Sequence, residues 1–204
     1  MRLPFFRKKK EKEIVVKNEY PSSSRERVLE ALTLLKLQES KLENKYRQLI
    51  QRSKDLFQAC VEALKDGDKP RATVYANEVV QLKRVSQVIL QSQLALKRTI
   101  LRLEIAQEFR DVVNVLGPTV NIIRSLEGSL KGVLPEVAYD LQKVNDMLDQ
   151  LVIEAGAVSP VSVDTSTSSR EAEKILKEAA ELAAQKTKEM LPELPEELKG
   201  LESR

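Results

Sequence analysis

The sequence predicts an all-α protein built on one long antiparallel helical hairpin, coiled-coil-like, followed by short helices and a linker-tethered C-terminal helix. Apolar residues recur at an average step of 3.5 over residues 28–63, which is the coiled-coil period. A short break rich in Asp, Gly and Pro then interrupts the pattern, which resumes beyond it. Charged residues make up 32% of the chain and aromatic residues only 4%, as is typical of long helices packed side by side.

The chain begins with a basic leader, residues 1–22, in which two Phe residues stand next to a run of cations. Each cation near an anionic leaflet contributes about 1 kcal/mol, and each inserted Phe at most about 1.5–3 kcal/mol. Either contribution alone is marginal, but together they favour a reversible membrane anchor. The predicted anchor residues are Leu3, Phe5, Phe6, Arg7, Lys8, Lys9 and Lys10. The alternative is a solubilising tail whose Phe residues pack on the helices.

The first arm of the hairpin is expected over residues 23–66. Ser23-Ser24-Arg25-Glu26 is a capping box, in which the Ser hydroxyl and the Glu carboxylate each satisfy an unpaired backbone N–H. Nine of the eleven positions along the apolar seam carry apolar or small residues, with Glu39 and Ser53 as the exceptions. The nine are Val28, Leu32, Leu35, Leu42, Tyr46, Leu49, Leu56, Cys60 and Ala63. Cys60 is therefore interpreted as a small core residue.

The hairpin tip is expected at Asp66-Gly67-Asp68-Lys69-Pro70. Gly67 suits a left-handed helix cap, Asp68 can cap the next helix, and Pro70 fits that helix's first turn. A break this short makes the second arm fold back antiparallel. Ala72 and Ala76 are small, which lets the two backbones approach closely near the tip.

The second arm is expected over 69–116, ended by Gly117-Pro118, which gives each arm a length of roughly 60–70 Å at about 1.5 Å per residue. Its seam carries Tyr75, Val79, Leu82, Ile89, Leu96, Ile100 and Leu103. Small, polar and β-branched residues over 157–169 are typical of a flexible linker. The remaining predicted segments are short helices 118–131 and 135–156, which complete a helical core of 23–156, a terminal helix 170–191 opened by a second capping box, and a tail 191–204.

Charge is divided unequally along the chain. Residues 1–98 hold 22 Lys and Arg against 12 Asp and Glu, a net charge of +10, and residues 99–204 hold 12 against 19, a net charge of −7. A basic first half suits an anionic surface. We expect Arg27, Lys41, Lys45 and Arg52, which fall on one side of the seam, to contact lipid or a neighbouring subunit. The alternative is a solvated face with pairs within the helix.

Several classes of chemistry are excluded by composition. The chain has no His, so imidazole bases, Ser-His-Asp triads and imidazole metal ligands are ruled out. A single Cys rules out an internal disulfide and thiolate zinc clusters. A Gly-rich phosphate loop, an apolar run long enough to span a bilayer and a secretory signal are also lacking. We therefore expect a cytosolic, non-enzymatic protein with no catalytic residues, no metal and no cofactor.

Two stretches of the second arm carry a family resemblance. Arg71-Ala72-Thr73-Val74-Tyr75-Ala76-Asn77-Glu78-Val79 and Leu94-Ala95-Leu96-Lys97-Arg98-Thr99-Ile100-Leu101-Arg102-Leu103-Glu104 look like archaeal ESCRT-III proteins of the CdvB group. The resemblance implies a cell-division subunit that forms polymers with itself and with paralogous subunits. Such a subunit would be peripheral on the cytoplasmic face of the cell membrane at the division site. The expected partners are anionic membrane lipids and an AAA ATPase that remodels the polymer.

The C-terminal segments take on roles through the same resemblance. The terminal helix 170–191 is expected to be regulatory, and Leu191-Pro192-Glu193-Leu194-Pro195 resembles a type 2 MIT-interacting motif that docks on the MIT domain of the ATPase. Proline fixes an extended backbone, and alternate Leu side chains fill pockets between helices. The predicted docking residues are Leu191, Pro192, Leu194, Pro195 and Leu198. The alternative is helix termination and a frayed tail. The C-terminal winged helix of CdvB itself is not expected, so the chain resembles a shorter paralogue.

Two other functions compete with the membrane-remodelling polymer. A basic coiled coil associated with nucleic acid would use the same basic half, but a nucleic-acid recognition module is not apparent, so we expect no nucleic-acid partner. A soluble helical adaptor would use the hairpin as a spacer and the tail as a ligand. It predicts no polymers.

Overall fold

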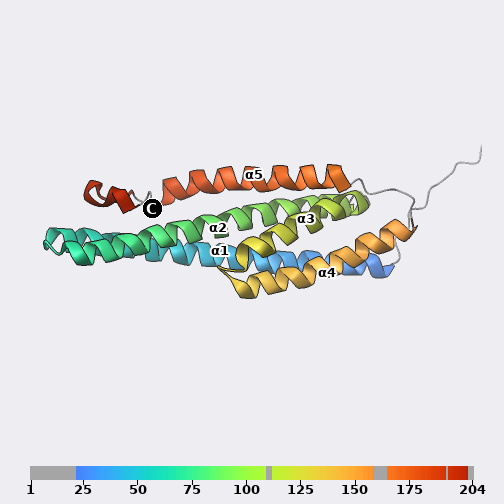
Figure 1. The fold of residues 1–204 in the computed structure, drawn as a ribbon. Coiled ribbons are helices and arrows are strands. Elements are labelled where there is room, and N and C mark those ends of the chain that lie inside the picture. Colours follow the sequence, from blue (N-terminus) through green and yellow to red (C-terminus); the bar gives the residue numbers. More distant parts are fainter. Residues whose placement is uncertain (1–21, 109–111, 159–164, 192, 202–204) are drawn as a thin grey trace, which may run out of the picture.

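The structure is a computed structural model that describes residues 22–108, 112–158, 165–191 and 193–201. All regular elements within these ranges are helices, which confirms the all-α fold class. The longest are α1 (Ser22–Lys65) and α2 (Lys69–Glu108), which pack along each other as an elongated pair. Three further α-helices, α3 (Val112–Leu130), α4 (Pro135–Val158) and α5 (Thr165–Met190), cover part of this pair, and a short 3-10 helix, η1 (Glu196–Leu201), follows (Figure 1).

The turn between α1 and α2 is fixed by two helix caps. Gly67 has a φ of 75°, and the backbone N–H groups of Gly67 and Asp68 donate to the carbonyls of Leu64 and Ala63, at 3.1 and 2.9 Å. This is the pattern of a Schellman cap, which requires the left-handed conformation that glycine adopts without steric cost. Asp68 Oδ1 then accepts a hydrogen bond from the Arg71 N–H at 3.1 Å and caps α2. The caps are those that the sequence predicts.

The apolar seam of both long helices forms the core. Eight of the nine predicted seam residues of α1 are buried and Leu56 is partly buried. The two polar exceptions also lie inward: Ser53 is fully buried, and Glu39 accepts a hydrogen bond from Gln93 of α2 at 3.0 Å. On α2 the largest fully buried side chains are Ile89, Leu96 and Leu103. The 3.5-residue period therefore identifies the side of each helix that packs on its partner.

The end of the second arm differs from the prediction. α2 ends at Glu108, and Gly117-Pro118 lies inside α3 instead of ending a helix at Leu116. A proline inside a helix lacks one backbone donor and costs about 3 kcal/mol. Here the neighbouring side chains Leu116, Val120, Ile122 and Ile123 are all buried, each contributing about 1.5–3 kcal/mol. Tertiary burial thus outweighs the local preference of proline.

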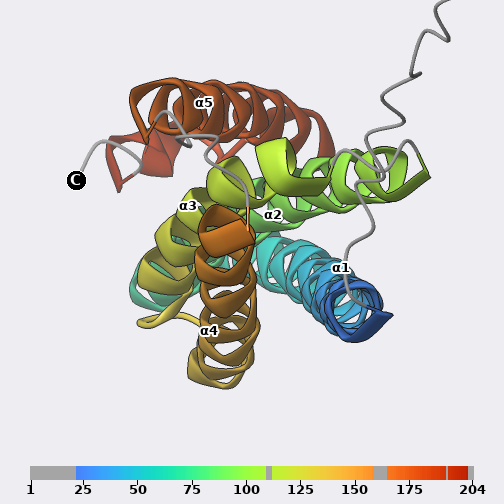
Figure 2. The same cartoon turned by 90° about the vertical axis from the view of Figure 1, so that its right-hand side faces the viewer.

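α3 and α4 form a second pair of helices that lies against the base of the first, where base denotes the end far from the α1–α2 turn. α4 runs opposite to α1, because Arg27 bonds Glu154 while Lys41 bonds Asp140. α5 runs opposite to α2, with ion pairs from Arg98 to Glu178 and from Arg102 to Glu171. Seen along the rod, α3, α4 and α5 gather around one side of the α1–α2 pair (Figure 2).

The predicted linker over 157–169 is shorter in the structure. α4 continues to Val158 and α5 already begins at Thr165, ahead of the predicted capping box at Ser168–Glu171, and residues 159–164 lie outside the described ranges. Ala172, Ile175, Ala179 and Ala183 of α5 are buried. Their 3- and 4-residue spacing gives α5 one apolar side, which packs on α2 and α3.

Candidate functional site

The tail after α5 lies against the hairpin near its tip. Leu191 and Leu194, both predicted docking residues, are only 3% and 2% exposed, and Leu198 and Pro195 are half-buried. Pro192, the fifth predicted docking residue, lies outside the described residues. The leucine side chains that were predicted to enter a partner are therefore already covered by this chain.

Leu194 packs in an apolar cluster that we call the tip socket. It is formed by Cys60, Ala63, Ala72, Ala76, Val79 and Val80. Small residues bring α1 and α2 close together here, and the Cys60 Sγ lies 3.4 Å from the Ala72 carbonyl oxygen. Burial raises the pKa of the Cys60 thiol, which keeps it neutral and unreactive. Cys60 is thus a packing residue, in line with its interpretation from the sequence.

The small residues of the tip have a second role that the sequence pattern does not predict. The sequence predicts that Ala72 and Ala76 allow close approach of the two arms, and both are fully buried. Their small side chains also leave room for Leu194. The apolar residues at 191, 194 and 198 follow 3- and 4-residue steps, a spacing that already indicates one buried side.

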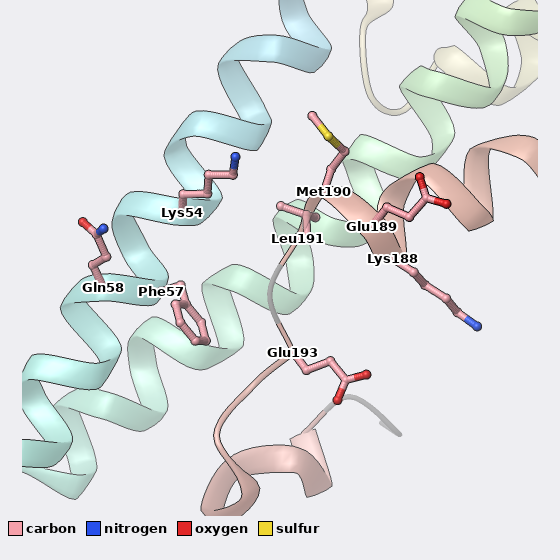
Figure 3. A pocket seen from close by; sticks show the side chains of 8 residues that line it. All are labelled: Lys54, Phe57, Gln58, Lys188, Glu189, Met190, Leu191 and Glu193. Carbon is pink, nitrogen blue, oxygen red and sulfur yellow. The ribbon is translucent and has the colours of Figure 1, made fainter.

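An open hollow of about 630 Å³ lies where the tail leaves α5. It is lined by Lys54, Phe57, Gln58, Lys188, Glu189, Met190, Leu191 and Glu193 (Figure 3). Lys188 and Glu189 point away from α1, whereas Leu191 is directed toward it. The lining mixes charged and apolar groups.

The predicted basic flank, Arg27, Lys41, Lys45 and Arg52, is divided by α4. Arg27 Nη1 lies 2.7 Å from Glu154 Oε1, and Lys41 Nζ lies 2.9 Å from Asp140 Oδ2. The Lys41 ammonium, which donates a hydrogen bond to Asp140, lowers the pKa of that carboxyl below its usual value. Half of the flank is thus neutralised within the chain.

The other half of the basic flank lies beyond the start of α4. Lys45 and Arg52 are exposed, and among the described residues neither forms an ion pair. On the other side of the seam Lys36 pairs with Glu104 and Arg47 pairs with Glu43. Lys45 and Arg52 are therefore the residues of the predicted flank that remain available to an external anion. The leader residues Leu3, Phe5, Phe6, Arg7, Lys8, Lys9 and Lys10 lie outside the described residues.

The part of the chain that the structure describes contains no group of three or more Cys, Asp or Glu residues arranged to hold a metal ion. None of its helices is both long enough and apolar enough to cross a membrane.

The sequence was compared with protein-family models, curated proteins and solved structures. No family model and no solved structure matches. Among curated proteins, the chain is 37% identical to cell division protein B1 of Sulfolobus acidocaldarius over 169 residues, which cover 83% of this chain and 79% of that protein. It is 34% identical to cell division protein B of the same organism over 161 residues, covering 79% of this chain and 62% of that protein. With this degree of identity over most of its length, the chain belongs to the CdvB family of cell division proteins.

Proposed function

We propose that this chain is a non-enzymatic, ESCRT-III-like subunit of the archaeal cell division apparatus. It binds the cytoplasmic face of the cell membrane at the division site, polymerises with itself and with paralogous subunits, and drives constriction and scission of the membrane. The observation that carries the proposal is the similarity to two proteins named for cell division, across about four fifths of this chain. Both are named as cell division proteins and neither as an enzyme.

Membrane binding in this proposal uses two parts of the chain. The leader supplies apolar and cationic residues at 3 and 5–10, and the exposed flank supplies Lys45 and Arg52. Arg27 and Lys41 become available only when α4 moves off α1, since Glu154 and Asp140 hold them. Such contacts with an anionic leaflet weaken as salt rises, because exposed charges are screened over about 8–10 Å at physiological ionic strength.

Docking of an AAA ATPase in this proposal uses the tail. Leu191 and Leu194 cannot enter a partner's MIT domain while Leu191 is buried in the main core and Leu194 in the tip socket, so the tail has to leave the hairpin first. Binding by the partner is then opposed by the free energy that holds the tail in place. The proposal therefore predicts that the isolated tail binds the ATPase more tightly than the full chain does.

The membrane part is tested by sedimentation with anionic vesicles. The full chain should pellet with the vesicles, and both removal of residues 1–10 and the double variant Lys45→Glu/Arg52→Glu should reduce the pelleted fraction. The matched control is Lys174→Glu/Lys177→Glu, which makes the same charge change at exposed positions of α5. Equal loss in both double variants would show that only net charge matters and would reject the flank.

Polymer formation and remodelling are tested by electron microscopy on the same vesicles. Filaments should form, and the cognate ATPase with ATP should disassemble them only when the tail is intact. Failure to polymerise under any condition would favour the adaptor function instead. Tighter binding to DNA than to anionic vesicles at equal salt would favour the nucleic-acid function.

A further inference from the structure

α4 leaves one side uncovered, away from the sides that contact α1 and α3. Tyr139 and Ile153 on this side are 60% and 70% exposed. Asp146 lies midway between them, is exposed, and forms no ion pair among the described residues. Because the three residues are seven positions apart, they lie in one line along the helix. We call these three residues the α4 stripe.

The charges on and beside the α4 stripe are acidic on balance. Lys143 Nζ lies 4.3 Å from the centroid of the Tyr139 ring, a cation–π contact within α4. Glu136, about one turn before Tyr139, is exposed and has no ion pair in the described part of the chain. With Asp146, two acids against one base give this side of α4 a net negative charge.

The hairpin has a complementary edge where α1 and α2 meet. Leu29 of α1 and Leu101 of α2 are 47% and 51% exposed. Lys97 of α2 is exposed and forms no ion pair with any described residue. All three lie beside the ion pair that joins Lys36 of α1 to Glu104 of α2. Leu29 precedes Lys36 by seven residues, and Lys97 and Leu101 precede Glu104 by seven and three, which are the spacings of neighbours on one side of a helix. We call Leu29, Lys97 and Leu101 the hairpin edge.

The described helices leave the hairpin edge uncovered. Leu29 lies two residues after Arg27, which bonds α4, and a step of about 200° places these two side chains on opposite sides of α1. Lys97 keeps its exposure although the next residue, Arg98, pairs with α5. In Figure 2 no described helix lies against the α1–α2 pair on the side away from α3 and α4. The hairpin edge and the α4 stripe thus belong to different sides of the molecule.

The position of Lys97 along the rod follows from the pairing of the two arms. The arms run antiparallel, and Glu39 of α1 meets Gln93 of α2 at a hydrogen bond of 3.0 Å. Four residues toward the base from this contact are Leu35 on one arm and Lys97 on the other. Lys97 is therefore level with Leu35, and Leu101 lies about one turn further toward the base.

The position of Asp146 follows from the pairing of α4 with α1. The two helices run in opposite directions, and Asp140 meets Lys41 at 2.9 Å. Six residues toward the base from this contact are Leu35 on α1 and Asp146 on α4. Asp146 is therefore level with the same residue as Lys97, and Ile153 lies about two turns further toward the base. The stripe and the edge thus place an acid and a cation at one level, each with apolar residues on its base side.

We infer that the α4 stripe of one copy binds the hairpin edge of a second copy of this chain, with the two rods parallel and level. A sideways displacement, without any shift along the rod, brings Asp146 against Lys97 of the second copy and Ile153 against its exposed leucines. Opposite charges then meet, and apolar side chains that one copy alone exposes are covered.

Such a contact joins two different surfaces, so each copy keeps one of them free and addition continues side by side. The inference rests on the proposed function in one respect, the polymerisation of the chain with itself, and it names the surfaces that make this contact. It uses neither the leader nor the basic flank, which leaves Lys45 and Arg52 available to the membrane.

Exchange of charge between two chains tests the contact in solution, without a membrane. Asp146→Lys and Lys97→Asp are made separately, and self-association is measured by sedimentation velocity at low salt. Each change alone places like charges across the contact and should weaken self-association several-fold. An equimolar mixture of the two variants should regain the association of the parent, because alternating chains pair opposite charges at every contact. The double variant Asp146→Lys/Lys97→Asp should regain it as well.

The matched controls reverse exposed charges on α5. Glu173→Lys and Lys174→Asp should each leave self-association unchanged. Asp146→Lys/Lys174→Asp has the same net charge as the restoring double variant, but it should associate as weakly as Asp146→Lys alone. Restoration by this control would show that only net charge matters and would overturn the inference.

Cross-linking between chains locates the contact. Ile153→Cys chains are mixed with Leu101→Cys chains and treated with a short bismaleimide, and the parent chain measures the background of Cys60, which is fully buried. Links should join the two kinds of chain, whereas Ile153→Cys chains alone should give none. Val74→Cys, at a position near the tip that is 66% exposed, replaces Leu101→Cys as the control and should also give none.

Several results would overturn the inference. These are a mixture of charge variants that stays dissociated, a parent that stays monomeric at low salt, and links between two Ile153→Cys chains, which would indicate a two-fold contact. Filaments on anionic vesicles that both charge reversals leave unchanged would reject this contact and keep the proposed function. Restored association in solution without filaments on vesicles would keep the contact and reject the membrane function.

Discussion

The base and the tip of the hairpin are built from the same repeat but stabilised differently. At the base the seam carries large residues such as Leu35, Leu96 and Leu103, and α3, α4 and α5 add further layers around it. At the tip the seam narrows to Cys60, Ala72 and Ala76, and the cover is the tail. A uniform heptad pattern can thus specify a core of large side chains at one end and, at the other, a narrow tip that the tail covers.

The largest effect is expected from weakening the base. Leu96→Ala removes a fully buried side chain and should lower the free energy of unfolding by about 2–5 kcal/mol. For a chain of this size each kcal/mol corresponds to about 2–4 °C in melting temperature, as measured by calorimetry. Lys97, the exposed residue next to Leu96, serves as the control, and Lys97→Ala should change the melting temperature little. Similar losses for both would contradict the assignment of Leu96 to the core.

The next effect concerns the tip. Ala76→Leu fills the fully buried tip socket and should displace Leu194, at a cost of about 1–3 kcal/mol from overpacking. Hydrogen exchange should quicken over residues 193–201 while protection at the base is kept. Val74→Leu, two residues away and 66% exposed, is the control. Unchanged exchange in the tail of the Ala76 variant would show that the socket does not hold it.

A smaller effect is expected where α4 covers α1. Asp140→Asn/Glu154→Gln removes the acids that hold Lys41 and Arg27, and exposed ion pairs of this kind contribute about 0–1 kcal/mol each. Stability should therefore change little, while sedimentation with anionic vesicles increases. Asp149→Asn/Glu43→Gln, which also removes two acids but breaks the pairs with Arg124 and Arg47 instead, is the control. Equal gains in vesicle binding for both variants would attribute the change to net charge.

The smallest effect is the pH dependence of the Lys41–Asp140 contact. Lys41 lowers the Asp140 pKa in the folded chain, so this carboxylate stabilises the fold at pH values above its unfolded pKa of about 3.9. That contribution is lost as the pH falls below about 4 and through the folded pKa. Melting curves of the parent and of Asp140→Asn should therefore converge in acid and differ slightly at pH 6–7. A difference that grows toward low pH would reverse the expected sign.

Much of the fold follows from the sequence because its main signals are local and repeated. The heptad seam, the Gly67 cap and the Asp68 cap depend on residues close together in the chain, and the structure has them at the predicted places. The predicted end of α2 is wrong. The prediction rests on the local tendency of Pro118 to end a helix, whereas in the structure the packing of α3 on its neighbours keeps Pro118 inside a helix.

The candidate site was less predictable for the same reason. Its residues were chosen from the leader, one side of α1 and the tail, but what covers each of them depends on contacts between distant segments. The pairing of Arg27 with Glu154 joins residues 127 positions apart, and Leu194 meets Ala72 across most of the chain. Such partners leave no periodic signal. Whether the flank and tail residues bind lipid and a partner stays a prediction.

The direction of α5 has a mechanical consequence. The tail lies at the tip, and α5 extends from the tail back toward the base. A pull applied beyond Leu198 therefore loads the contacts one after another: first those of Leu198 and Leu194, then those of Leu191, and then the ion pairs of Glu178 and Glu171. Contacts that are loaded one at a time open at a lower force than contacts that are loaded simultaneously. A weak, processive pull would thus remove α5 and the tail while leaving the hairpin itself under little tension.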